Sequence, residues 1–333
     1  MLNRINNSLD NNSSFKHSGN AMLSRFLKEY GGILGALITL VFISTFLSEY
    51  FWSVNNMTNI ILQSSIVAIV AFGMTYAILL AGIDLSVGSI VALTGMILVL
   101  GLTAGIPFGI MLPLSLAISA LCGFANGFVT TFLGVHPFIV TMSFMGIFRG
   151  IAMLTSDGKA ISLYDNAAFE FIFNGYMFGI PFPIILLVAM IVLNHYLLSK
   201  TTFGRKVYLV GGNAEAAAYS GINVSKTTVY SYMIAGLMSG IGGVMLASRM
   251  FSAQPNAAMG MELDAIAACV LGGTSLTGGR GTIIGTVIGA LIIAVLSNVM
   301  SLMNVNYFVS LIVKGVVILL AVGIDVYKNK KAA

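Results

Sequence analysis

The sequence predicts an all-α polytopic membrane protein with about ten transmembrane helices. Of its 333 residues, 58% are hydrophobic and only 8% are charged, whereas soluble domains carry about 25% charged residues. The apolar runs are continuous and close to the length, about 20 residues, of a helix that crosses the hydrocarbon core. Because polar residues do not alternate with apolar ones, the runs predict helices rather than barrel strands. A soluble enzyme is therefore excluded.

The ten apolar spans are expected to be separated by turns and by two long polar loops, at 155–180 and 200–226. The order is a polar tail at 1–30, a transmembrane domain at 31–327 and a basic tail at 328–333. The spans run roughly over 31–48, 58–80, 88–104, 109–133, 137–154, 181–199, 228–248, 263–273, 283–303 and 306–324.

The distribution of basic residues predicts the orientation. The N-terminal tail holds four Lys and Arg residues, the 200–226 loop four, Arg280 one and the C-terminal tail three, so 12 of 16 lie on one side. Such an excess marks the cytoplasmic face, where both termini and the 200–226 loop are expected. The 155–180 loop is then periplasmic. An acidic outer rim is expected from Glu49, Asp157, Asp165, Glu170, Glu262 and Asp264.

Two short segments resemble one another. LAGIDLSVG at 80–88 and LGGTSLTGG at 271–279 align without gaps and share two leucines and two glycines at matching positions. Transporters are often built from repeats in which interrupted helices mark the binding region. Nine residues leave two alternatives open, a weak parallel repeat and a chance match.

The chain carries no recognisable chemistry of its own. A phosphate-binding loop requires GxxxxGK[ST], and the nearest segment, Gly273–Thr282, has Gly279 in place of the lysine and Arg280 displaced. The three histidines are not clustered, and Cys122 and Cys269 lie in apolar runs, where small core residues are expected. We therefore expect no enzymatic activity, metal or cofactor. The basic residues lie beside spans, so the net charge of +5 does not indicate a nucleic-acid partner.

Two charged side chains interrupt the apolar regions. Asp84 lies between two spans and is followed by Ser86. One of them is expected to cap the next helix; the alternative is an ion- or proton-coupling site, because a carboxylate at the bilayer centre costs about 3 kcal/mol. Lys314 lies in the middle of a span, where it could pair with a carboxylate, bind backbone carbonyls or extend to the interface. A structural role is favoured.

The 200–226 loop predicts a short exposed helix. Gly211-Gly212-Asn213 permits a sharp turn, Asn213 is suited to cap the stretch AEAAAYS, and Gly221 is suited to end it. Small side chains on this helix would let it lie in a groove of another protein. A plain connector between two spans is the alternative.

The motif G-R-x-x-Y-x-V-G-G-N-x-x-A-A-x-x-S-G-I at 204–222 resembles the cytoplasmic coupling segment of bacterial ABC permeases of the ribose type, the second class of carbohydrate-uptake transporters. The segments at 81–95, 252–292 and 313–325 resemble the same family. Together they cover nearly all of residues 50–328, with 155–180 the weakest part.

The resemblance implies a multi-pass permease in the bacterial inner membrane that forms a homodimer, or a heterodimer with a paralogue, around a translocation path. A periplasmic sugar-binding protein would deliver the cargo, and a separate ABC ATPase subunit would dock below. By the motif match, the coupling element comprises Gly204, Gly212, Asn213, Glu215, Ala216, Ser220, Gly221 and Ile222. The intramembrane polar candidates are Asp84, Ser86, Arg280 and Lys314.

The function expected from this resemblance is ATP-driven import of a monosaccharide, ribose or a related sugar. One alternative is a permease of the same family for another small polar cargo, such as a sugar-like signal, a nucleoside or a branched-chain amino acid. A second is an ion-coupled secondary transporter that uses Asp84 and Lys314.

Overall fold

The computed structural model describes residues 24, 27 and 30–332. Four short strands form two antiparallel pairs: β1 (Ile161–Ser162) with β4 (Ser252–Ala253), and β2 (Tyr176–Met177) with β3 (Ile180–Pro181). The helices are the first helix (Tyr30–Leu47), α2 (Val54–Leu79), α3 (Val87–Thr103), α4 (Phe108–Phe132), α5 (Pro137–Leu154), α6 (Ala167–Asn174), α7 (Phe182–Lys200), α8 (Thr202–Gly212), α9 (Ala214–Tyr219), α10 (Val224–Met250), α11 (Met261–Leu271), α12 (Ile283–Leu302) and α13 (Tyr307–Ala332).

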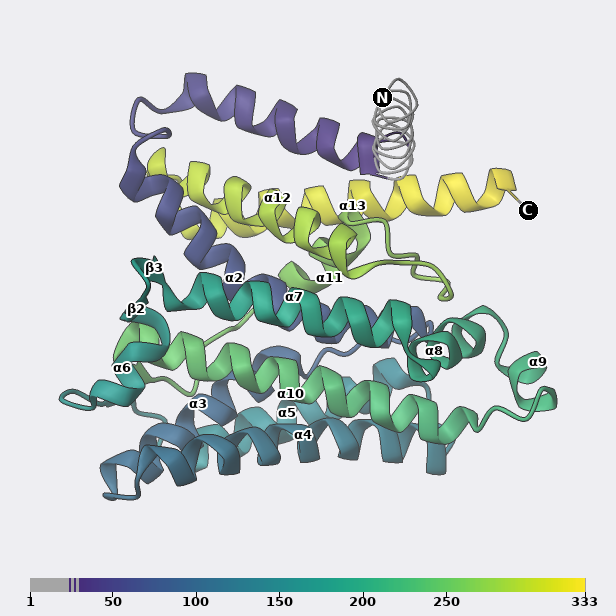
Figure 1. The fold of residues 1–333 in the computed structure, drawn as a ribbon, viewed down its shortest axis with the longest axis horizontal. Helices are drawn as coiled ribbons and strands as arrows, with labels where there is room; N and C mark the ends of the chain where they lie inside the picture. Colours follow the sequence, from purple (N-terminus) through teal and green to yellow (C-terminus); the bar gives the residue numbers. More distant parts are fainter. Residues whose placement is uncertain (1–23, 25–26, 28–29, 333) are drawn as a thin grey trace, which may run out of the picture.

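The long helices run along one common axis (Figure 1). One end of the bundle carries α8 and α9 and is called the α9 end; the other carries α6 and the strands and is called the α6 end. The predicted 1–30 tail lies almost entirely outside the described residues, and so do the side chains of the predicted basic tail at 328–333.

The prediction of a mostly helical membrane protein is confirmed, but three of the predicted spans are short. Seven helices of the described chain are long and apolar enough to cross a membrane. Of the others, α3 has 17 residues, the apolar part of α13 is Phe308–Leu320, and α11 has only 11. At 1.5 Å per residue α11 is about 16 Å long, roughly half the thickness of the hydrocarbon core. The segment predicted as a span at 263–273 is therefore only half a crossing.

Small residues let the central helices touch backbone to backbone. A Cβ on Gly123 of α4 would lie 2.1 Å from the Tyr232 carbonyl oxygen of α10, and one on Gly236 would lie 2.3 Å from the Ser119 carbonyl oxygen. The pair of α11 and α12 is equally close, since a Cβ on Gly289 would lie 1.9 Å from the Ala268 carbonyl oxygen. Close approach through small residues is how helices associate in membranes.

The hydrophilic loop predicted at 155–180 contains a helix, α6, that was not predicted. Asn166 caps α6 by accepting from the Phe169 N–H at 3.1 Å, and Phe169 is fully buried. The Ser248 hydroxyl of α10 donates to the Phe169 carbonyl oxygen at 2.7 Å and accepts from the Phe173 N–H at 3.1 Å. The loop is therefore anchored to the bundle.

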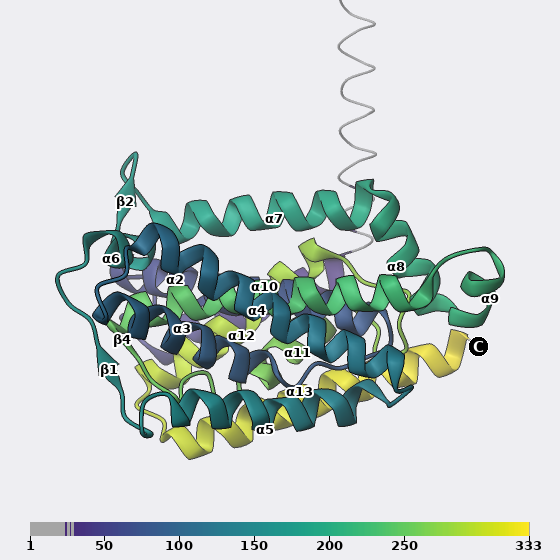
Figure 2. The same ribbon diagram turned by 90° about the horizontal axis from the view of Figure 1, so that it is seen from below.

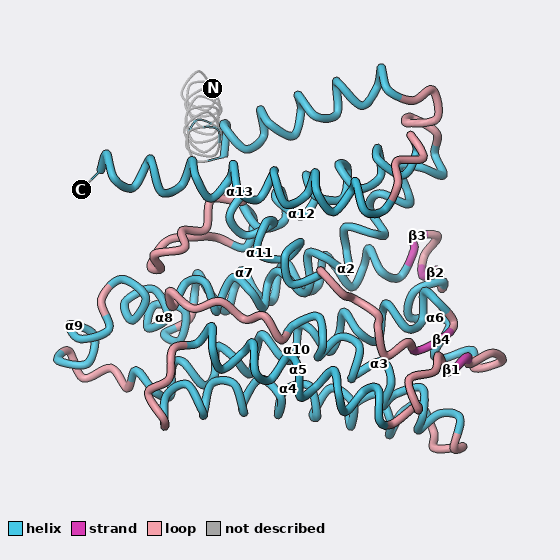
Figure 3. Tube along the Cα trace, turned by 180° about the vertical axis from the view of Figure 1, so that it is seen from behind, coloured by secondary structure: helices cyan, strands magenta, loops and turns pink. Residues whose placement is uncertain are grey.

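The bundle has two contrasting sides. Figure 2 shows α7 along one side of the bundle and α5 and α13 along the opposite side. After β4 the chain does not turn straight into a helix but runs as a loop among the helices to α11 (Figure 3). This irregular segment, residues 254–260, contacts α5 through Arg149.

Candidate functional site

The predicted coupling segment forms two short helices at the α9 end. Asn213 ends α8 and caps α9, because its Oδ1 accepts a hydrogen bond from the Ala216 N–H at 2.9 Å. The chain leaves α9 at Gly221, whose φ of +80° is left-handed. The predicted cap and helix end are confirmed. The turn predicted to begin at Gly211 is wrong, because Gly211 and Gly212 both belong to the last turn of α8.

The surface of α9 is almost entirely exposed. Ala217 is the one buried residue of the helix. Tyr219, which was not among the predicted coupling residues, is 92% exposed. Beside them is a groove of about 310 Å³, lined by Tyr208, Leu209, Gly212, Asn213, Ala216, Ala217, Ser220 and Ile222. A projecting aromatic ring next to a shallow groove with several small side chains suits a protein partner, because such rings anchor interfaces.

The last turn of α8 lies where two chain breaks meet. The first break, residues 80–86, joins α2 to α3, and the second break, residues 272–282, joins α11 to α12. The Gly279 N–H donates to the Leu79 carbonyl oxygen at 2.9 Å. A Cβ on Gly211 would lie 1.7 Å from that same oxygen and 2.9 Å from the Gly279 nitrogen. A shift of α8 therefore reaches both breaks directly.

A second contact ties α8 to the second break. The Tyr208 hydroxyl donates to the Gly281 carbonyl oxygen at 2.7 Å. Tyr208 also lines the groove beside α9. The groove and the second break are thus connected through one side chain.

The two breaks begin in the same way. The Gly82 N–H bonds to the Ala77 carbonyl oxygen at 3.0 Å, and the Thr274 N–H bonds to the Cys269 carbonyl oxygen at 2.9 Å. Both bonds span five residues back along the chain, as in a Schellman helix end. The gap-free alignment, however, pairs Gly82 with Gly273 and not with Thr274, so the two bonds are offset by one residue relative to the alignment. The internal repeat stays a prediction.

Asp84 forms a local, fully buried network in the first break. Its Oδ1 accepts from the Ser86 N–H at 2.9 Å and from the Ser86 hydroxyl at 2.6 Å. Asn126 Nδ2 of α4 donates to the Ser86 hydroxyl at 2.7 Å. Neither Asp84 nor Ser86 caps α3 with its side chain, so the predicted cap is wrong. Asp84 instead holds the residue that precedes the helix.

Arg149 of α5 holds the irregular segment 254–260 inside the bundle. Its Nη1 donates to the carbonyl oxygens of Pro255 and Ala257, both at 2.7 Å. Irregular backbone at membrane depth is tolerated only where its polar groups are satisfied. A guanidinium supplies several donors at once, so a charged side chain replaces part of the hydrogen bonding that a helix would provide.

Glu262 lies at the junction of two helix starts. Its Oε1 accepts from the Gly260 N–H at 3.2 Å, just before α11. A Cβ on Gly88, in the first turn of α3, would lie 2.5 Å from its Oε2. The positive ends of two helix dipoles therefore stabilise this carboxylate, and Arg149 lies within electrostatic reach of it.

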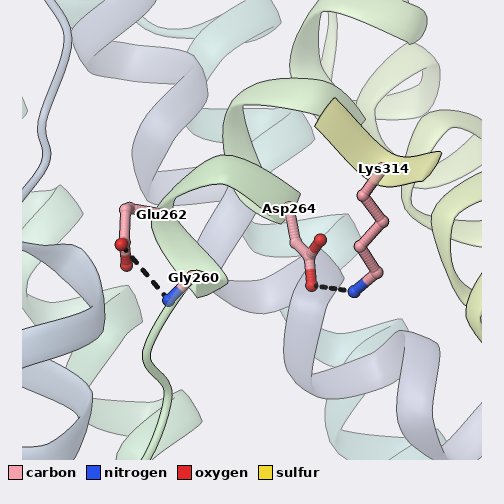
Figure 4. A network of polar contacts seen from close by, with 4 residues as sticks. All are labelled: Gly260, Glu262, Asp264 and Lys314. Carbon is pink, nitrogen blue, oxygen red and sulfur yellow. Dashed lines mark hydrogen bonds and ion pairs between the residues drawn. The ribbon is translucent and has the colours of Figure 1, made fainter. Parts of the chain in front are cut away.

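Lys314 of α13 points at Asp264 of α11 (Figure 4), with Nζ 2.9 Å from Oδ2. Their side chains are 20% and 17% exposed. Of the three alternatives for Lys314, pairing with a carboxylate is the one observed. The prediction that Glu262 and Asp264 form part of an outer rim is wrong, because both lie partly buried among the helices.

The remaining predicted residues separate into buried and exposed positions. A Cβ on Gly204 would lie 1.9 Å from the Leu198 carbonyl oxygen, so Gly204 packs the corner between α7 and α8 rather than facing a partner. Arg280 is exposed in the second break, and Glu215 is exposed on α9. Among the described residues, no three His, Cys, Asp or Glu side chains group closely enough to hold a metal ion.

Comparison with known proteins identifies related chains. Residues 56–322 match the family described as "Branched-chain amino acid transport system / permease component". The ribose import permease protein RbsC of Haemophilus influenzae is 43% identical over 94% of this chain and 98% of its own length. That of Bacillus subtilis is 44% identical over 92% and 94%. The D-allose transport system permease protein AlsC of Escherichia coli is 36% identical over 90% and 92%. No solved structure gives a significant match.

Proposed function

The chain belongs to the family of permease components of branched-chain amino acid transport systems, and on that premise we propose that it is the membrane-spanning subunit of an ATP-driven sugar importer. The cargo is a monosaccharide, ribose or a related sugar, as the names of its relatives suggest. The chain is a transport subunit and not itself an enzyme. ATP hydrolysis belongs to a separate ABC ATPase subunit.

The observation that carries the proposal is the joint at the α9 end. The exposed α9, with Tyr219 at its tip, continues from α8, whose Gly211 lies against both chain breaks. A partner that displaces α9 changes the relative position of α2, α3, α11 and α12 through these contacts. Alternating access requires this kind of element, one that a partner's binding energy can shift between two arrangements.

The side of α5 and α13 is proposed as the translocation path in a homodimer, or in a heterodimer with a paralogue. Four charged side chains lie between these helices and are partly exposed: Arg149, Glu262 and the paired Lys314 and Asp264. Charged groups are costly against lipid and mark substrate pathways. A second subunit over this side would shield them from lipid and enclose a polar passage. Planar carboxylates and a guanidinium are suited to bind sugar hydroxyls.

The α9 end is proposed to face the cytoplasm of a bacterial inner membrane. Basic residues gather there: Lys200 ends α7, Arg205 and Lys206 belong to α8, Lys226 lies in the first turn of α10, and Arg280 follows Gly279, which lies against Gly212. Such an excess marks the cytoplasmic side. The α6 end would then receive the periplasmic sugar-binding protein, and its Asp157, Asp165 and Glu170 supply an acidic surface.

A direct test compares two aromatic tips at opposite ends of the bundle. Tyr219→Ala and Glu215→Lys should reduce co-purification of the ATPase subunit and sugar uptake in proteoliposomes. Tyr176→Ala, which removes a ring that is 65% exposed at the α6 end, should leave ATPase binding unchanged. Normal ATPase binding and uptake in both α9 variants would refute the assignment.

The cargo is tested separately from the coupling. The sugar-binding protein that works with this permease should be stabilised thermally by ribose or a related monosaccharide. Stabilisation by a nucleoside or a branched-chain amino acid instead would keep the coupling mechanism and replace the cargo. An ion-coupled mechanism using Asp84 and Lys314 has less support, because Lys314 pairs with Asp264 and Asp84 is bound to Ser86.

A further inference from the structure

A groove of about 580 Å³ lies on the outside of α10, between α4 and α8. It begins beside the first turn of α10 and continues to Leu237, eleven residues after Lys226. Its lining is Ala120, Thr202, Phe203, Lys206, Asn223, Lys226, Thr227, Tyr230, Met233, Ile234 and Leu237. Eleven helical residues span about 16 Å, so the groove is long as well as open.

The length of the groove matches one leaflet of a bilayer. Half of the hydrocarbon core is about 15 Å thick, so the groove extends from the membrane surface at the α9 end to near the bilayer centre. Its part farther along α10 is apolar, with Met233, Ile234 and Leu237, and Phe203 of α8 adds an aromatic ring to the lining. A soluble partner cannot reach this depth, whereas an acyl chain lies there by default.

The mouth of the groove is positively charged. Lys206 and Lys226 are both exposed and both line it, beside Thr202, Asn223 and the exposed Tyr230. No acidic residue lines the groove. Within the described part of the chain the one ion pair is Lys314–Asp264, so no carboxylate there pairs with either lysine.

We propose that this groove binds one anionic glycerophospholipid, with its phosphate between Lys206 and Lys226 and an acyl chain along Phe203, Ile234 and Leu237. Basic pockets between membrane helices bind anionic headgroups in this way. The site is independent of the cargo. Because Phe203 and Lys206 belong to α8, a bound lipid would link α8 to α10 beside the joint at Gly211.

Native mass spectrometry of the full-length permease in detergent tests the site. The probes are dioleoyl phosphatidylglycerol, which is anionic, and dioleoyl phosphatidylcholine, which has no net charge. At about 1 kcal/mol for each lysine, the protein should retain one phosphatidylglycerol with about 30-fold preference. The double variant Lys206→Gln with Lys226→Gln should lose this preference.

Two further variants make the test specific. Lys200→Gln with Arg205→Gln removes the same charge from the same end but outside the groove, and should keep the preference. Leu237→Trp fills the deep part and should release the lipid with both lysines intact. The proposal is overturned if Lys206→Gln with Lys226→Gln keeps its preference, or if the control loses as much. If Lys206→Gln with Lys226→Gln loses the ATPase subunit while its lipid binding is unchanged, the groove is a protein-docking surface and the lipid proposal is overturned.

Discussion

Replacing Arg149 tests whether a charged side chain holds the irregular segment 254–260 inside the membrane. In Arg149→Met the carbonyl oxygens of Pro255 and Ala257 lose donors at 2.7 Å. A hydrogen bond to a charged group contributes about 2 kcal/mol, so the loss is about 4 kcal/mol. For a large chain this lowers the melting temperature by about 8 °C. Arg149→Lys retains one donor centre, so about half of the loss is expected.

The assay is thermal unfolding in detergent, followed by intrinsic fluorescence and by the fraction that remains monodisperse after heating. Arg249→Met is the matched control, because Arg249 lies over the Phe173 ring at 5.5 Å and donates to no carbonyl oxygen among the described residues. Such a contact contributes about 1 kcal/mol, so its melting temperature should fall by about 2 °C. If Arg149→Met melts within 2 °C of this control, Arg149 does not hold the segment.

Three further changes probe other contacts. Gly211→Ala should abolish uptake and destabilise the protein by about 2 kcal/mol, because its methyl group meets the Leu79 oxygen. Gly212→Ala, with open space around it, should leave the melting temperature unchanged, and equal melting temperatures of the two variants would disprove the close contact at Gly211. Lys314→Met should lower the melting temperature, because it leaves the Asp264 carboxylate unpaired. Adding Asp264→Asn should restore at least half of this decrease, and no recovery in the double variant argues against the ion pair. Asp84→Asn should keep ATP-driven uptake in proteoliposomes, because an amide oxygen still accepts both bonds from Ser86; complete loss would favour ion coupling.

Local signals in the sequence predicted the short exposed helix α9 well. Asn213 before a run of alanines and Gly221 after it define a helix by capping chemistry that acts over a few residues. The structure has both features where they were expected. Tyr219 was not predicted as a partner-binding residue, because its exposure is visible only in the structure. An aromatic residue among alanines in a polar loop was nevertheless a usable signal.

The sequence could not predict the segment before α11. The polar residues at 254–262 suggest an external loop, but Arg149, more than a hundred residues earlier in the chain, donates to two of their carbonyl oxygens inside the bundle. The partner of Lys314 was equally hidden, since fifty residues separate it from Asp264. Both depend on tertiary contacts, which hydropathy and spacing do not encode. The helix α6 was a different failure, because Phe169 and Phe173, four residues apart, were available as a signal of an amphipathic turn.

The inner contact of α8 at Gly211 and the outer, partner-facing surface of α9 are formed by different residues. Inside, Gly211 of α8 lies against Leu79 and Gly279 through backbone atoms, and the Tyr208 hydroxyl of the same helix adds a hydrogen bond to the Gly281 carbonyl oxygen. Outside, α9 presents side chains alone to whatever docks there. Partner choice can therefore diverge by substitution on α9 while the mechanical connection stays unchanged. Exchange of residues 214–220 between related permeases should accordingly transfer the preference for an ATPase subunit and leave the contacts of α8 with the two breaks unchanged.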